Sequence, residues 1–207
     1  CLGSECPKFQ DCFVVKARRK AQEADVVVVN HHLLFADLAI KREGFGEILP
    51  GAQAFILDEA HQIAEVASQF FTKSVSYRQL VDLCRDTQTE AGAQSGALAL
   101  LQPAISELEQ RTREFRLALD DLPIKGPWWQ AAERPGVIEA VGTLTAALEG
   151  LVATLEAQSE RSTGLEACAA RAGDAVARLA RACGGGKEGE VCWYELFQRG
   201  FALHEIG

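Results

Sequence analysis

The hydrophobic positions near the start of this chain form two short uninterrupted runs. They are Val26–Val29 and Ala54–Leu57, and polar residues flank both runs. Runs of this length, rich in β-branched or aromatic residues, are typical of buried strands in a parallel sheet. Between them, Asn30 is a suitable N-cap for a helix that extends to about Lys41. The order strand, helix, loop, strand predicts one α/β unit.

Helical spacing takes over after a helix that is expected at about Ala60–Phe71. Apolar residues then recur at alternating steps of three and four, which predicts long helices packed side by side. The first series is Leu98, Leu101, Ile105, Leu108, Phe115, Leu119 and Leu122, with Thr112 at the one polar position. The second series is Val137, Val141, Leu144, Leu148, Leu151 and Leu155. A third helix is expected at Leu165–Cys183, and the residues of Val191–Leu203 predict a return to strand.

Two adjacent tryptophans, Trp128 and Trp129, lie between the two helical series. We expect them to fill the corner where one helix leads into the next. Stacking on single-stranded bases is the alternative that their chemistry allows.

Composition places the chain among globular proteins, with 48% hydrophobic and 24% charged residues. It contains no methionine and opens on Cys1, so we expect a piece of a longer protein. No run of about 18 apolar residues exists, and neither a transmembrane helix nor a signal peptide is predicted. A cytoplasmic location without membrane contact is therefore expected.

The net charge of −8 argues against nucleic-acid binding through the whole surface, because phosphate contacts need lysine and arginine. Any such contact must be local, and the one dense basic cluster is Lys16, Arg18, Arg19 and Lys20. On the helix expected at Phe13–Ala24, Lys16, Arg19 and Lys20 share one face. They are candidate DNA-phosphate contacts, and a solvated helix face is the alternative.

The strongest local motif is Asp58-Glu59-Ala60-His61, which follows the second apolar run directly. Ligands of open α/β sheets bind at the carboxyl ends of strands, where these two carboxylates would meet a nucleotide. Asp58 would hold the magnesium ion of Mg-ATP, and Glu59 would orient and deprotonate the attacking water. The alternative is structural, with Asp58 capping the helix and Glu59 favoured near its N-terminus.

The partner motif Gly-x-x-x-x-Gly-Lys-Ser/Thr is absent from the chain. The β- and γ-phosphates of ATP would therefore have no binding loop in it. By itself this chain is expected to be inactive. The segment from Gly184 to Lys187 resembles such a loop, but Glu188 occupies the position of the magnesium-binding hydroxyl. We therefore do not expect a phosphate loop there.

Three of the seven cysteines lie within the first twelve residues, at Cys1, Cys6 and Cys12. Their irregular spacing is closer to that of iron–sulfur ligands than to the paired cysteines of structural zinc sites. A reduced cysteine-rich loop or a zinc site completed by another residue is the alternative. The remaining cysteines are expected to fill the core: Cys84, Cys168, Cys183 and Cys192.

Taken together, these segments resemble the DinG/YoaA branch of the XPD-like superfamily 2 helicases, with the YoaA-type members favoured. The resemblance rests on the three cysteines, on "ADVVVVNHHLL", on "FILDEAHQIAEVASQFF" and, near the end, on "WYELFQRGFALH". It is close up to about Ser76. Between there and the final segment it rests on position and helical character.

The resemblance implies an ATP-dependent helicase of DNA repair or replication that unwinds DNA in the 5′-to-3′ direction. It makes Cys1, Cys6 and Cys12 three of the four ligands of a [4Fe-4S] cluster. It also makes Asp58 the magnesium ligand, Glu59 the catalytic base and His61 the residue that couples the nucleotide state to DNA contacts. The expected partners are single-stranded or forked DNA and the rest of the helicase, including its second motor domain. A monomer is expected.

The fold implied is a partial RecA-like α/β domain, with a parallel sheet and a large all-helical arch insertion. Residues 1–20 would be the end of the iron–sulfur domain, and residues 21–75 a part of the first motor domain. Residues 76–190 would be the arch, and residues 191–207 the strand that returns to the motor domain.

A second hypothesis comes from a different class of protein. In it, the chain is a non-catalytic metal-binding and helical interaction module, and the Asp-Glu-Ala-His sequence is incidental. The two hypotheses differ over the roles of Asp58 and Glu59.

Overall fold

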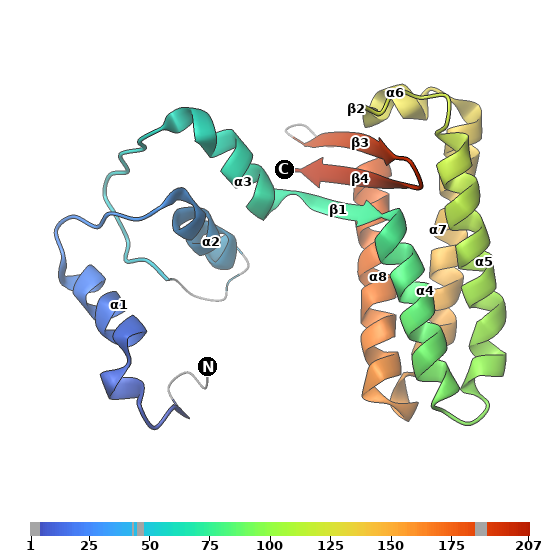
Figure 1. The fold of residues 1–207 in the computed structure, drawn as a ribbon, viewed down its shortest axis with the longest axis horizontal. Coiled ribbons are helices and arrows are strands. Elements are labelled where there is room, and N and C mark those ends of the chain that lie inside the picture. The colour runs from blue at the N-terminus through green and yellow to red at the C-terminus, as the bar shows by residue number, and fades with distance from the viewer. Residues whose placement is uncertain (1–4, 43, 45–47, 185–189) are drawn as a thin grey trace. The chain divides into compact units, whose positions relative to one another are not determined.

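The computed structural model describes residues 5–42, 44, 48–184 and 190–207. The chain divides into two compact units, Cys1–Phe71 and Thr72–Gly207 (Figure 1). The boundary falls directly after the last helix of the first unit. Each unit has its own helices and its own apolar contacts.

The first unit consists of short helices. They are η2 (Phe9–Asp11), α1 (Phe13–Glu23), α2 (His31–Arg42), η3 (Ala60–Gln62) and α3 (Ile63–Phe71). The predicted cap of α2 is confirmed, because the Leu33 amide donates to Asn30 Oδ1 at 2.8 Å. Helix α2 packs on α3 through Phe35, whose ring lies 5.9 Å from that of Phe71 and nearly perpendicular to it. Edge-to-face pairs of this kind add to the stability that burial provides.

A buried carboxylate joins α2 to the loop that follows it. Asp37 is only 2% exposed and accepts hydrogen bonds from the amides of Ile48 at 2.6 Å and Leu49 at 2.9 Å. Lys41, one helical turn further along α2, forms an ion pair with it, with 2.8 Å between Lys41 Nζ and Asp37 Oδ2. Burial acts to raise the pKa of Asp37, but Lys41 and the two amides together hold that pKa below its ordinary value. The loop is therefore fastened to the helix by a charged group.

The two predicted strands of a parallel sheet are not formed in this structure. Neither Val26–Val29 nor Ala54–Leu57 is assigned to a strand, and the side chains of Val28 and Ile56 are 92% and 97% exposed. A strand needs a neighbour that pairs with its backbone N–H and C=O groups. Among the residues described in this unit, no segment provides that pairing. The described structure is thus mostly helical, and the parallel sheet of the expected α/β architecture stays a prediction.

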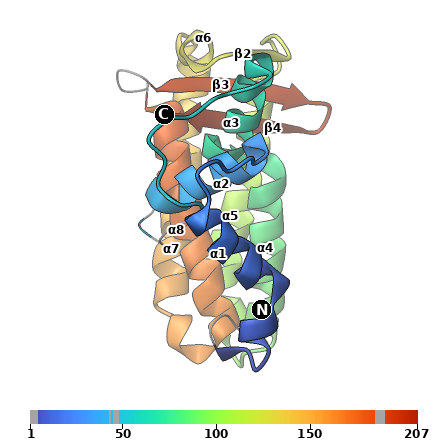
Figure 2. The same ribbon diagram turned by 90° about the vertical axis from the view of Figure 1, so that its left-hand side faces the viewer.

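The second unit combines a helical bundle with a small sheet. Its helices are α4 (Tyr77–Gly92), α5 (Ala97–Ala118), α6 (Trp128–Ala132), α7 (Pro135–Glu156), η4 (Ser159–Arg161) and α8 (Thr163–Cys183). Its strands are β1 (Lys73–Ser76), β2 (Lys125–Pro127), β3 (Val191–Phe197) and β4 (Gly200–Ile206). Helix α4 packs against α5 and α8, and α7 completes the bundle by contacting the same two helices (Figures 1 and 2).

Both predicted apolar series lie in the core of this bundle. In α5, Leu101, Ile105 and Leu108 are at most 1% exposed. In α7 the same holds for the leucines of the stripe, which are Leu144, Leu148, Leu151 and Leu155. The polar position in the first series is also buried, and the Thr112 hydroxyl donates to the Leu108 carbonyl at 2.7 Å. That bond satisfies the hydroxyl within its own helix, which makes burial inexpensive. The helical predictions for α5, α7 and α8 are confirmed.

The sheet is antiparallel throughout, with strand order β1-β4-β3-β2. It lies across the end of the bundle at which α4 begins and α5 ends (Figures 1 and 2). Phe201 of β4 contacts Phe115 of α5 edge to face, with ring centroids 4.8 Å apart. The strand predicted at Val191–Leu203 is confirmed as a β3–β4 hairpin. Its partner strands β1 and β2, which the apolar pattern did not predict, lie in the same unit.

The adjacent tryptophans have different environments. Trp128 is 1% exposed, and its indole N–H donates to the Cys183 carbonyl at 3.0 Å. Trp129 is 64% exposed. The expectation that both fill a corner between helices is therefore correct for Trp128 and wrong for Trp129, because a five-residue helix can turn only one of two consecutive side chains inward.

Two of the cysteines expected in the core are fully buried. Cys84 and Cys168 are at most 2% exposed, whereas Cys183 and Cys192 are partly buried. Burial raises the pKa of Cys84 to about 12, so its thiol stays protonated and unreactive at neutral pH.

Helix α7 is long and apolar enough to cross a membrane, by length and composition alone. Its apolar stripe is instead packed inside the bundle, with Leu148 and Leu151 fully buried. A core helix of a globular protein satisfies the same test.

Candidate functional site

The two adjacent carboxylates of the Asp-Glu-Ala-His motif lie on a tight turn that leads into η3. Glu59 has φ 48° and ψ 45°, the left-handed conformation that few residues other than glycine adopt. Two hydrogen bonds support the turn. The Glu59 amide donates to Asp58 Oδ1 at 2.9 Å, and the Gln62 amide donates to the Glu59 carbonyl at 2.9 Å. Non-glycine residues in this conformation cluster at functional sites, where the surroundings maintain the strain.

The side chains of this turn are open to solvent. His61 Nδ1 lies 3.3 Å from Glu59 Oε2, and the two side chains are 72% and 60% exposed. Asp58 uses one carboxylate oxygen for the backbone bond and keeps the other available. Carboxylate oxygens are the ligands that Mg²⁺ prefers in proteins. The turn therefore presents two carboxylates and an imidazole to whatever approaches it.

The cysteine segment lies in the same unit as this turn. Cys6 and Cys12 are free, partly exposed thiols, and Cys1 lies outside the described residues. Cys12 is the residue that precedes α1, and the backbone amides of Val15 and Val14 hold its pKa below the ordinary value, with a smaller contribution from Arg18. A thiolate stabilised at a helix N-terminus is a good metal ligand. The donor chemistry of Cys12 thus fits a cluster ligand.

The predicted ligands are only partly described. Within residues 5–42, 44, 48–184 and 190–207, no three histidine, cysteine or acidic side chains are arranged to hold a metal ion. Cys6 and Cys12 are two ligands at most, so the predicted three-cysteine set stays a prediction. The glycine-rich segment after Gly184, for which no phosphate loop was expected, also lies outside the described residues.

The basic face of α1 is exposed and partly engaged by the turn before it. Lys16 Nζ lies 3.3 Å from Asp11, and Arg19 donates to Gln10 Oε1 at 3.2 Å. Lys20 is exposed on the same face. Exposed ion pairs of this kind are weak and are readily exchanged for other partners. A phosphate could replace Asp11 and Gln10 without burying any charge.

Two groups of polar side chains were not predicted from the sequence. Asp37 holds the loop after α2, and a single aspartate in a helical pattern gives no indication of burial. Arg171 and Arg178 of α8 line a pocket between α8 and α4. Their spacing of seven residues, which places both on one helix face, was the available indication.

No protein-family model matches the chain. It is 41% identical over 203 residues to the ATP-dependent DNA helicase YoaA of Escherichia coli strain K12, which covers 98% of this chain. The corresponding protein of Haemophilus influenzae is 37% identical over 205 residues. Over a shorter region of 66 residues, the chain is 41% identical to the ATP-dependent helicase DinG of Mycobacterium tuberculosis strain ATCC 25618 / H37Rv. The chain spans about a third of the length of the two YoaA proteins, 32% of each.

Proposed function

Starting from the premise that this chain is a DinG/YoaA-like segment, we propose that it is part of the motor of an ATP-dependent 5′-to-3′ DNA helicase. The observation that carries this proposal is the similarity to YoaA along 98% of the chain. The matched region includes the Asp58–His61 motif and the helices of the second unit. The parent would act in DNA repair or replication in the cytoplasm, as a monomer on single-stranded or forked DNA.

In this proposal, the turn at Asp58 and Glu59 is the Walker B half of the ATPase site. Asp58 would hold the magnesium ion of Mg-ATP through its uncommitted carboxylate oxygen. Glu59 would accept the proton of the attacking water. The left-handed conformation of Glu59 supports this assignment, because non-glycine residues held in that conformation cluster at functional sites. The phosphate-binding loop would come from the rest of the parent protein.

His61 would couple the nucleotide state to DNA contacts. It lies 3.3 Å from the Glu59 carboxylate, so it can respond to whether Glu59 is engaged with water or free. A neutral imidazole can accept or donate a hydrogen bond through either nitrogen. A change in the hydrogen bonding of Glu59 would therefore alter the hydrogen bonds of His61, and through His61 the contacts with DNA.

The exposed apolar runs support a RecA-like parallel sheet in the parent. The side chains of Val28 and Ile56 are almost entirely exposed. The runs to which they belong nevertheless have the composition of buried strands. Pairing with strands from the rest of the protein would cover them. Residues 21–75 would then belong to the first motor domain, residues 76–190 to a helical arch, and residues 191–207 to the return towards that domain.

The cysteine segment, residues 1–20, would end an iron–sulfur domain. Cys1, Cys6 and Cys12 would supply three ligands to a [4Fe-4S] cluster, and a fourth would come from elsewhere in the parent. A bound cluster would cross-link this segment to the rest of its domain. The backbone amides of Val15 and Val14 lower the pKa of the Cys12 thiol and so favour the thiolate that such a cluster requires.

The basic face of α1 lies directly after the third cysteine, so it would contact DNA beside the cluster. Lys16, Arg19 and Lys20 would bind backbone phosphates without reading the sequence. A basic face confined to one helix would allow a chain of net negative charge to bind DNA, because the rest of its surface need not contact the phosphates.

An experiment on the full-length parent tests the proposal. We expect Asp58→Asn to lose magnesium-dependent ATP hydrolysis, because a neutral amide binds Mg²⁺ more weakly than a carboxylate does. Asp25→Asn, which changes an exposed aspartate outside the motif, is the matched control and should hydrolyse ATP normally. A parent that binds metal but hydrolyses no ATP with or without DNA would instead support the non-catalytic interaction module.

A further inference from the structure

A shallow groove of about 210 Å³ lies between α7 and α8, which run side by side in the bundle (Figures 1 and 2). Its floor consists of Val152, Ala153, Gly173 and Val176. Ala153 is exposed, and the other three residues are only partly buried. In the most apolar 18-residue stretch of α7, only 28% of the residues are buried. The bundle core therefore leaves part of the apolar surface of α7 and α8 uncovered.

Two glycines on this side of the bundle have open space around them. A Cβ added at Gly142 of α7 or at Gly173 of α8 would meet no atom beyond its own stretch of helix within 4 Å. Glycine is a poor helix former, so a glycine inside a helix lowers its stability unless its small size is used. Gly173 lines the groove, and Gly142 lies two turns from Glu149 on the same face of α7. At both positions another backbone can approach closely.

The charged residues that line this groove are acidic. Glu149 and Glu156 border it, seven residues apart on one face of α7, and both are exposed. Helix α7 contains no lysine or arginine. In the part of the chain that the structure describes, neither carboxylate has an ion-pair partner. On α5, by contrast, Glu107 and Glu109 each pair with an arginine one turn away. The groove therefore has a local negative charge that nothing in the described structure compensates.

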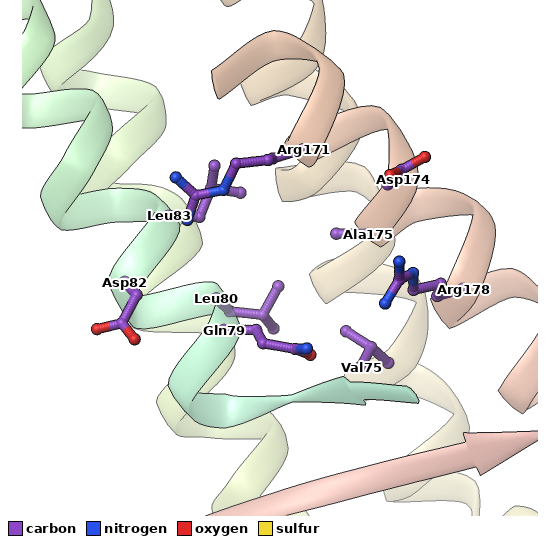
Figure 3. A pocket seen from close by; sticks show the side chains of 9 residues that line it. All are labelled: Val75, Gln79, Leu80, Asp82, Leu83, Arg171, Asp174, Ala175 and Arg178. Carbon is purple, nitrogen blue, oxygen red and sulfur yellow. The ribbon is translucent and has the colours of Figure 1, made fainter. Parts of the chain in front are cut away.

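The pocket on the other side of α8 has a different character. It lies between α8 and α4, and Figure 3 shows two arginines and two aspartates around it, which are Arg171, Arg178, Asp82 and Asp174. Their opposite charges balance, and the large apolar side chains that line this pocket are already buried in the bundle core. The groove between α7 and α8 differs on both counts, because its charge is of one sign and its floor is partly exposed.

The sign of this charge argues against three kinds of occupant. Nucleic acid and an anionic membrane would both bring further negative charge to Glu149 and Glu156. A second copy of the chain, docked symmetrically through the same face, would place these glutamates against their own counterparts. The groove is complemented instead by a segment that has a small apolar surface and positive side chains at its margins.

We propose that the groove binds an amphipathic helix of a partner protein, with lysine or arginine residues seven positions apart. Glu149 and Glu156 are two helical turns apart, so cations with the same spacing on a helix that lies along α7 meet both carboxylates. Small apolar residues between those cations cover Val152 and Val176, and the two backbones come close at Gly173. The proposal is independent of the helicase assignment, because it uses only the α7–α8 surface and requires neither ATP nor DNA.

Fluorescence anisotropy with the full-length parent tests this proposal. The probe is a labelled helical peptide of four Lys-Ala-Ala-Leu-Ala-Ala-Gln repeats, in which each lysine is seven residues from the next. We expect a dissociation constant on the order of 100 μM. The same peptide with glutamate in place of lysine should bind at least about tenfold more weakly, as should the lysine peptide to the variant Glu149→Gln with Glu156→Gln. Glu139→Gln with Glu160→Gln is the matched control, because it removes the same charge from exposed residues outside the groove.

A further variant, Gly173→Leu, tests the shape of the groove. Its Cβ meets no atom within 4 Å and leucine favours helix, so circular dichroism should show a fold at least as stable as that of the unmutated parent. The added side chain fills the groove and should weaken binding of the lysine peptide at least about tenfold. Several results would overturn the proposal. They are equal binding of the two peptides, an equal loss in the matched control, or full binding by Gly173→Leu. Binding to the 207-residue chain but not to the parent would show that another part of the parent covers the groove, which would also refute a partner protein.

Discussion

The backbone amide of Glu59 donates a hydrogen bond to the side chain of Asp58 at 2.9 Å, while Glu59 itself adopts a left-handed conformation. The motif's first carboxylate therefore stabilises the backbone that positions its second. This relationship gives the two residues separate tasks, since one is tied to the turn and the other extends from it.

The separation of tasks predicts the effect of Glu59→Gln in the full-length parent. Binding of ATP and DNA should persist because Asp58 is unchanged, whereas turnover should fall by at least about 100-fold because the base is removed. Steady-state hydrolysis and nucleotide-binding assays measure the two quantities. Glu65→Gln, an exposed change in α3, serves as the control. Turnover within a few-fold of the unmutated parent would refute the assignment of Glu59.

The cysteine segment leads to a prediction about metal content. The parent purified without oxygen should contain about four iron and four sulfide per chain. Cys6→Ser and Cys12→Ser should abolish unwinding more than ATP hydrolysis, because the cysteines are not in the Asp58–Glu59 turn. Cys192→Ser, which changes a partly buried cysteine of the second unit, should leave both activities intact. Stoichiometric zinc without sulfide would contradict this prediction.

The basic face of α1 predicts a change in salt dependence. Replacing Lys16, Arg19 and Lys20 by alanine in the parent should weaken binding to all single-stranded sequences alike. It should also flatten the plot of log affinity against log salt, by about 0.7 per lost phosphate contact. Arg18→Ala should do less, because Arg18 lies on another face. Fluorescence anisotropy across a salt series measures this. An unchanged slope in the triple variant would place the DNA path elsewhere.

The buried carboxylate of Asp37 predicts how the first unit responds to acid. Its pKa is lower in the folded protein than in the unfolded chain, so its contribution to stability is complete at neutral pH. That contribution is lost as the pH falls below about 4, through the ordinary pKa of aspartate and then the folded one. Asp37→Asn should expose the amides of Ile48 and Leu49 to hydrogen exchange at neutral pH, at a cost of about 1–2 kcal/mol.

Amide exchange followed by NMR at several pH values checks this prediction. The difference between Asp37→Asn and the unmutated chain should be largest near pH 7 and should diminish below pH 4. Asp25→Asn, an exposed change, should behave like the unmutated chain at every pH. A difference that stays constant with pH would show that the Asp37 charge has no part in fastening the loop.

Much of the helical structure could be predicted from the sequence because helix formation is local. The stripes in α5 and α7 need only residues three and four positions apart to agree, and each stripe marks the face that is buried. The cap of α2 required only Asn30 and the amide of Leu33, three residues away. The Asp58–Glu59 motif was also visible in the sequence, but its left-handed backbone was not.

The strands depended on partners that lie far away along the chain. Lys73–Ser76 has no apolar run, yet it is a strand because it pairs with residues 202–205. Val26–Val29 has the composition of a strand and is none in this structure, because no described segment of its unit pairs with it. The same reasoning explains why Trp128 reaches the Cys183 carbonyl and why Arg178 reaches the Ser74 carbonyl, because both partners lie far away along the chain. The sequence by itself therefore determined most of the helices, although not α4 or α6, and where the reactive side chains occur. Only the tertiary structure decided which strands form and which side chains meet, because hydrogen-bonded pairing and burial require two segments at once.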